Sequence, residues 1–82
     1  MSDNDILSMM KSSLDQVAPG WSKEVKDFGP GVKFRDMAVD SVQIMEMVGI
    51  IEERCHCQFA DEDLAQINKV GDMLNLIKKV AA

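Results

Sequence analysis

Apolar side chains recur at intervals of three and four residues in three separate stretches of this 82-residue chain. That spacing places them on one face of an α-helix, which must be buried against other elements. The predicted helices run from Ser2 or Asp3 to just before Pro19, from Ser41 to about Arg54, and from about Val70 to Val80. The sequence therefore predicts an all-α bundle.

A long connection and a short helix join these three helices. Residues 18–39 contain three Gly and two Pro and are predicted to form a long first loop, anchored on the helices by four apolar side chains. These anchors are Trp21, Phe28, Val32 and Phe34. A brief helix is predicted from the acidic run at residues 60–63 through Ile67. We expect one domain spanning residues 1–82, too small for a separate catalytic domain.

The negative charge of the chain is concentrated in its middle third. The net charge is −5, yet residues 36–63 hold eight acids and one base, a local net charge of −7. Such a chain is a poor ligand for nucleic acid, which requires clustered Lys and Arg. The acidic segment either attracts basic protein partners or is simply a solvated face that keeps the protein soluble.

Without a signal peptide or a membrane-spanning run, the expected location is cytoplasmic, with no stable membrane insertion.

The second predicted helix has two distinct faces. Asp40 is a good N-cap residue for it, and Ile44, Met47, Val48 and Ile51 form its core stripe. The opposite face mixes aliphatic and polar or acidic positions, as partner-binding surfaces do, although scattered exposed aliphatic residues are also common. That face carries Val42, Gln43, Glu46, Gly49, Ile50 and Glu53.

One ordered pattern in the sequence is the most informative. It is Phe-Arg-Asp-Met-Ala-Val-Asp-Ser-Val at residues 34–42, then Glu46, then Ile-Ile-Glu-Glu at 50–53, then Phe-Ala-Asp-Glu-Asp at 59–63. This pattern resembles the acyl carrier protein family, as a discrete stand-alone member, and the match runs without gaps from about Phe34 to Ile77. The resemblance implies that a transferase attaches 4′-phosphopantetheine from coenzyme A to Ser41, aided by Asp40, and that the thiol of this arm holds acyl groups as thioesters.

The resemblance also implies partners and site residues. Partners would be the phosphopantetheinyl transferase and the synthase, reductase and dehydratase enzymes of fatty-acid biosynthesis, or of a specialised fatty-acid or polyketide pathway, each with a basic docking patch. The residues expected to meet them are Asp40, Val42, Glu46, Ile50, Glu52 and Glu53. The residues expected to line an acyl pocket between the second and third helices are Met47, Val48, Ile51, Leu64 and Ile67. We expect a monomer that is not an enzyme and has no catalytic residue, since no group is positioned to activate Ser41.

Several positions depart from the family pattern, and rival functions stay open. Ala38 replaces a usual Gly, Val42 a usual Leu, and Gln43 and Gly49 stand where an acid and a bulky apolar residue are frequent, which suggests a different partner set. Cys55-His56-Cys57 is expected to pack in the core from an extended link rather than bind metal, because three converging ligands are not in place. The alternatives are an aminoacyl or peptidyl carrier, which usually has Gly-Gly-x-Ser, an unmodified helical interaction module, and a small Cys-His metal protein.

Overall fold

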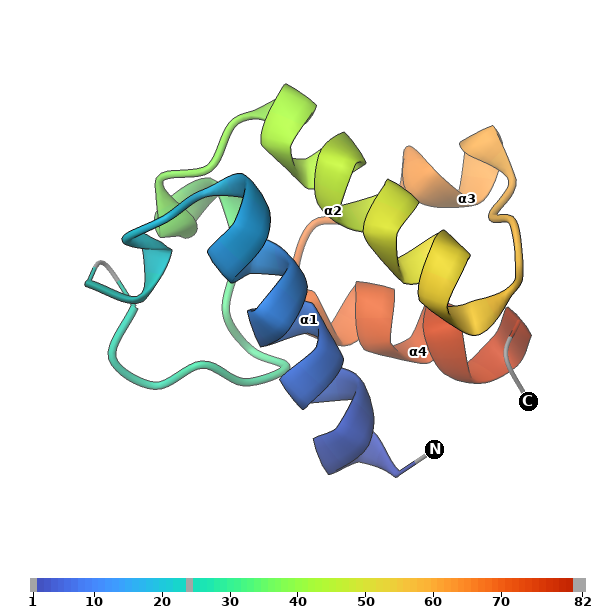
Figure 1. Ribbon diagram of the computed structural model, residues 1–82, viewed down its shortest axis with the longest axis horizontal. Helices are drawn as coiled ribbons and strands as arrows, with labels where there is room; N and C mark the ends of the chain where they lie inside the picture. Colours follow the sequence, from blue (N-terminus) through green and yellow to red (C-terminus); the bar gives the residue numbers. More distant parts are fainter. Residues whose placement is uncertain (1, 24, 81–82) are drawn as a thin grey trace.

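The computed structural model describes residues 2–23 and 25–80, and within them the chain is a bundle of helices (Figure 1). The α-helices are α1 (Asp3–Val17), α2 (Ser41–Cys55), α3 (Asp61–Leu64) and α4 (Val70–Val80), and the 3₁₀ turns are η1 (Trp21–Lys23) and η2 (Phe34–Met37). α1 packs against both α2 and α4. The predicted fold class, three main helices and one short one with a long first loop, is confirmed. None of the helices in the described residues is long and apolar enough to cross a membrane.

The helix ends follow from capping chemistry. Ser2 and Asp5 form a capping box at the start of α1, in which each side chain accepts a hydrogen bond from the backbone of the other. α2 runs one residue beyond its predicted end and stops where His56 adopts a left-handed conformation with φ of 53°. The extended link therefore begins at Cys57, not at Cys55 as the alternating pattern suggested.

α3 is shorter than predicted and ends at Leu64 rather than Ile67. The N–H groups of Gln66 and Ile67 donate to the carbonyls three residues before them, Asp63 and Leu64, at 3.2 Å each. These i→i−3 hydrogen bonds replace the i→i−4 pattern of an α-helix, so the α-helix ends and the chain continues as a tighter turn.

The core is filled by aliphatic residues and unusually many methionines. Five of the seven methionines are buried, four of them completely. The buried methionines are Met9, Met10, Met37, Met47 and Met73. Met packs through an unbranched, flexible side chain, so these residues can adjust their shape to fill the space between the branched aliphatic residues.

The long loop is held at two places. Trp21 is buried, its Nε1 donates to Asp15 Oδ1 at 2.7 Å, and its ring meets Phe28 edge-on at 5.1 Å. Nearer α2, residues 30–34 pair with residues 68–71 at the start of α4: Phe34 N donates to Asn68 O, Val70 N to Val32 O, and Gly71 N to Pro30 O, at 2.9–3.0 Å. The loop that leads to Ser41 is thus attached to α4, and all four predicted anchors are buried or partly buried.

Candidate functional site

Ser41 is the first residue of α2, and its side chain is exposed. The helix start is fixed by a second capping box: Asp40 Oδ1 accepts from Gln43 N at 2.8 Å, and Gln43 Oε1 accepts from Asp40 N at 3.0 Å. Gln43 Nε2 also donates to the carbonyl of Val17 at 3.5 Å, which links the start of α2 to the end of α1. An exposed hydroxyl on a well-capped helix start is open to modification, and the neighbouring helix N–H groups favour a bound phosphate.

A groove of about 590 Å³ opens beside Ser41. Its lining comes from η2, the start of α2 and the segment before α4, and consists of Lys33, Phe34, Arg35, Val39, Asp40, Ser41, Ile44, Ile67 and Asn68. Apolar side chains and two cations therefore share one concave surface that includes the candidate attachment serine. Its volume is in the range of pockets that hold small organic ligands, about 300–1,000 Å³.

The groove differs from the acyl pocket that the resemblance suggested. Of the five expected lining residues, only Ile67 borders the groove beside Ser41. Met47, Val48 and Ile51 are buried in the core, and Leu64 is partly buried against it. Ile44 was assigned to the core stripe, yet it is only half-buried because it faces the groove.

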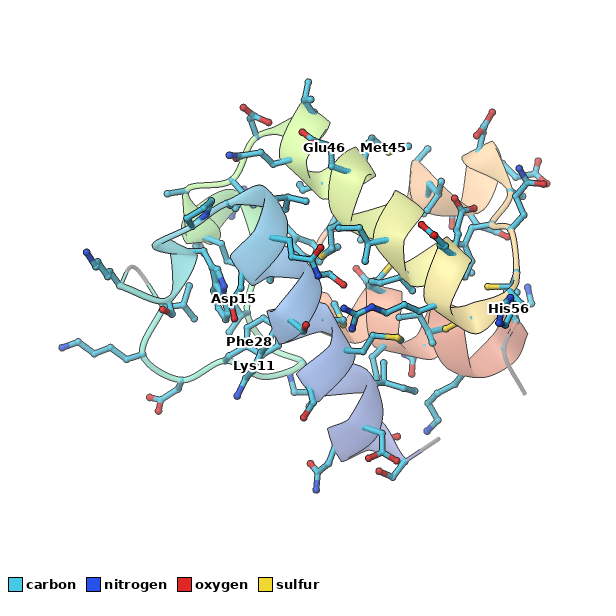
Figure 2. All side chains as sticks on the ribbon, in the orientation of Figure 1. Lys11, Asp15, Phe28, Met45, Glu46 and His56 are labelled. Carbon is cyan, nitrogen blue, oxygen red and sulfur yellow. The ribbon has the colours of Figure 1, made fainter. Side chains whose placement is uncertain are left out.

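The outer face of α2 presents apolar and acidic side chains together. Val42 is 67% exposed and Met45 51% exposed, and Glu46, Gly49 and Glu53 are exposed alongside them, with Ile50 partly exposed. Met45 and Glu46 lie on the outer side of the helix (Figure 2). Sequence reasoning missed Met45, although it stands three residues after Val42 and so shares its face.

Glu52 is held differently from the other acids of α2. Its Oε2 accepts a hydrogen bond from the backbone N–H of Phe59 at 2.7 Å, and the residue is partly buried. This bond fixes the link after α2 to the helix itself. Glu52 thus has a role within the fold, in contrast to the exposed Glu46 and Glu53.

The Cys55-His56-Cys57 segment closes α2 on the side away from Ser41. Cys55 and Cys57 are free thiols packed against the core, and Cys55 Sγ lies 3.8 Å from Met9 Sδ. His56 points outward (Figure 2) and is exposed. Partial burial, together with the neighbouring Cys55 and Glu52, raises the pKa of the Cys57 thiol. The core packing expected for both cysteines is confirmed.

Comparison with known proteins identifies the class of site. The family model described as "Phosphopantetheine attachment site" matches residues 19–77, more than half of the chain. An acyl carrier protein of Solidesulfovibrio magneticus is 33% identical over 57 residues, covering 68% of this chain and 73% of that protein. An acyl carrier protein of Rickettsia bellii is 30% identical over 64 residues, covering 77% and 79%.

A third relative, an acyl carrier protein of Clostridium acetobutylicum, is 35% identical over 43 residues, covering 52% of this chain and 56% of that protein. No solved structure gives a significant match. The family model spans the exposed serine, the groove, α2, α3 and most of α4. This chain therefore belongs to the acyl carrier protein family, whose members bear 4′-phosphopantetheine and serve enzymes as carriers rather than acting as enzymes themselves.

Proposed function

We propose that Ser41 is the attachment residue for 4′-phosphopantetheine and that the chain carries acyl intermediates of fatty-acid biosynthesis. The observation that carries the proposal is the exposed hydroxyl of Ser41 at the start of α2, beside a groove large enough for a small organic group. The acyl carrier proteins among its relatives support the same assignment.

The residues around Ser41 fit a covalently attached phosphate. The first N–H groups of α2 have no partner within the helix and favour an anion, while Asp40 and Gln43 keep that helix start rigid. The arm supplies a terminal thiol, which carries the acyl group as a thioester. The protein contributes position and shelter: it displays the hydroxyl to a transferase and offers the groove beside it.

We further propose that partner enzymes dock on the outer face of α2, which we call the docking face: Val42, Met45, Glu46, Ile50 and Glu53. Exposed acids around apolar side chains suit a basic patch with an apolar centre. The partners of this kind are the phosphopantetheinyl transferase and the synthase, reductase and dehydratase enzymes. Glu52, which the resemblance placed in this set, is engaged by Phe59 and contributes less to docking in our proposal.

Mass spectrometry tests the attachment directly. The apo protein is incubated with coenzyme A, Mg²⁺ and a broad-specificity transferase, and the intact mass is measured. We expect a gain of one phosphopantetheine that is lost in Ser41→Ala and kept in Ser22→Ala, a matched change at another exposed serine. No gain with several transferases, or an undiminished gain in Ser41→Ala, would remove Ser41 as the attachment residue.

Charge reversal tests the docking face. Glu46→Lys with Glu53→Lys should raise the KM of a cognate synthase by about tenfold at low salt, because exposed charges act mainly on encounter. The control combines Asp27→Lys with Glu62→Lys, which makes the same total change at exposed positions outside the docking face. Equal turnover by both double variants would contradict this docking surface.

The pathway itself is tested by elongation. A standard fatty-acid synthase set should load and elongate the holo protein, and failure there with success in a polyketide or unusual fatty-acid system would move the assignment to a specialised pathway.

We also propose that residues 1–82 form one cytoplasmic, monomeric carrier domain. Positions 1, 24 and 81–82 of that domain lie outside the residues that the structure describes.

A further inference from the structure

We propose that Lys33 and Arg35 bind the phosphodiester of the arm, so that the pantetheine lies along the groove beside Ser41 instead of extending freely into solvent. This inference rests on the proposed attachment at Ser41. It assigns a function to two cations for which the resemblance gave no role, and it makes the groove the place where the arm rests.

The fold directs both cations outward. η2 is a 3₁₀ turn, in which residues three apart share a face, and its buried residues are Phe34 and Met37. Lys33 and Arg35 flank Phe34 and are exposed, and both line the groove that contains Ser41. The backbone of this segment is fixed, because Lys33 pairs with Lys69 in an isolated β-bridge and Phe34 N donates to Asn68 O at 3.0 Å.

Electrostatics favour an anion at this place. Neither Lys33 nor Arg35 forms an ion pair with another described residue. The salt bridge among the described residues joins Lys78 of α4 to Asp3 of α1 at 3.1 Å, away from the groove. One carboxylate, that of Asp40, also lines the groove, but its Oδ1 is turned to the backbone N–H of Gln43. The groove thus has a net charge of +1 from its lining side chains in a protein of net charge −5.

The chemistry of the lining matches the rest of the arm. A phosphodiester accepts hydrogen bonds from a guanidinium in pairs and from an ammonium singly, so an Arg and a Lys together suit it. Beyond the phosphate, the pantetheine has a dimethyl group and two amides. Val39, Ile44 and Ile67 offer apolar contact for the dimethyl group, and Asn68, whose side chain is exposed, offers an amide partner.

³¹P NMR of the holo protein tests the proposal, after intact mass has shown one arm per chain in every variant. In the unaltered protein, the phosphodiester resonance should differ from that of a phosphopantetheinylated serine peptide. It should approach the peptide value as salt rises to about 1 M, where the screening length is about 3 Å. Lys33→Gln with Arg35→Gln should give the peptide value at low salt, and each single change an intermediate one. Nuclear Overhauser effects between the dimethyl group and Ile44 or Ile67 should weaken in parallel.

The matched control is Lys26→Gln with Lys79→Gln, which removes two exposed cations that do not line the groove and should leave the ³¹P resonance where it is in the unaltered protein. Identical resonances in all holo variants would overturn the inference and leave attachment at Ser41 standing. The inference also falls if the Lys33 and Arg35 changes affect only an acidic acyl group, such as malonyl, and not the phosphodiester. Failure of the unaltered chain to gain the arm would overturn both proposals.

Discussion

Two helical glycines should respond in opposite ways to the same added methyl group. Gly49 lies exposed in the middle of α2, and a Cβ built on it would meet no atom within 4 Å beyond its own stretch of helix backbone. In Gly71, the second residue of α4, a Cβ would lie 2.9 Å from the carbonyl oxygen of Pro30 and 3.2 Å from its Cβ. Gly71 N already donates to that same oxygen at 2.9 Å, so the two segments cannot separate without losing the bond.

The magnitudes follow from helix propensity and overpacking. Ala is better than Gly in a helix interior by about 0.8–1.0 kcal/mol, so Gly49→Ala should raise the free energy of unfolding by about that amount. Gly71→Ala gains less, because it lies in the first turn, and must move backbone atoms at a cost of about 1–3 kcal/mol. With a first-turn gain of about 0.5 kcal/mol, we expect Gly71→Ala to lower the free energy of unfolding by about 0.5–2.5 kcal/mol, the difference between these two effects.

Thermal and urea unfolding followed by circular dichroism would measure both variants. A change of 1 kcal/mol shifts Tm by about 4–8 °C in a domain of this size, so the opposite shifts are easily resolved. Stabilisation by Gly71→Ala equal to that by Gly49→Ala would refute the close approach between Pro30 and α4. Because that approach also holds the loop before Ser41, Gly71→Ala should additionally slow loading by a transferase.

Three further outcomes can be measured on the same material. Glu52→Ala should lower the free energy of unfolding by about 1–2 kcal/mol, because it leaves the N–H of Phe59 without its partner, while Glu53→Ala should change it by less than about 0.5 kcal/mol; equal effects in urea would contradict the role of Glu52. The pKa of the Asp72 carboxyl is lowered by hydrogen bonds from the N–H groups of Asn68 and Lys69. Its stabilisation should therefore be present above about pH 4 and disappear as the pH falls through the folded-state pKa, and Asp72→Asn should flatten this part of the acid-unfolding curve. Finally, the raised pKa of Cys57 leaves less thiolate at neutral pH, so its thiol should react more slowly with iodoacetamide than a small free thiol does. Alkylation of Cys57 as fast as that of the small thiol would contradict the raised pKa.

The helices and the place of Ser41 could be predicted from the sequence because both depend on local chemistry. Helical spacing and the capping residues Ser2 and Asp40 involve residues within one or two helical turns, so these signals can be recognised in the sequence. The resemblance then singled out Ser41 as the serine at the start of the acidic helix. The role of Gln43 was also accessible, since a Gln three residues after an Asp N-cap completes a capping box.

The groove could not be predicted, because it depends on contacts between segments far apart in the chain. Residues 30–34 meet residues 68–71 through backbone hydrogen bonds, which leave no periodic signature in the side chains. Without that pairing, Lys33 and Arg35 are two charges in a loop. The structural role of Glu52 could not be predicted for a related reason. Its partner is the backbone N–H of Phe59, which does not depend on the side chain at position 59.

The methionine-rich interior has a consequence for how the protein could receive cargo of different lengths. Met10, Met37, Met47 and Met73 are fully enclosed, and each can rotate about three side-chain bonds without branching at Cβ. Rotamer changes in such side chains redistribute free volume inside the domain while the helix axes stay in place. The energy barrier for an acyl chain to enter or leave the interior would then come from rotation of the methionine side chains and not from separation of the helices.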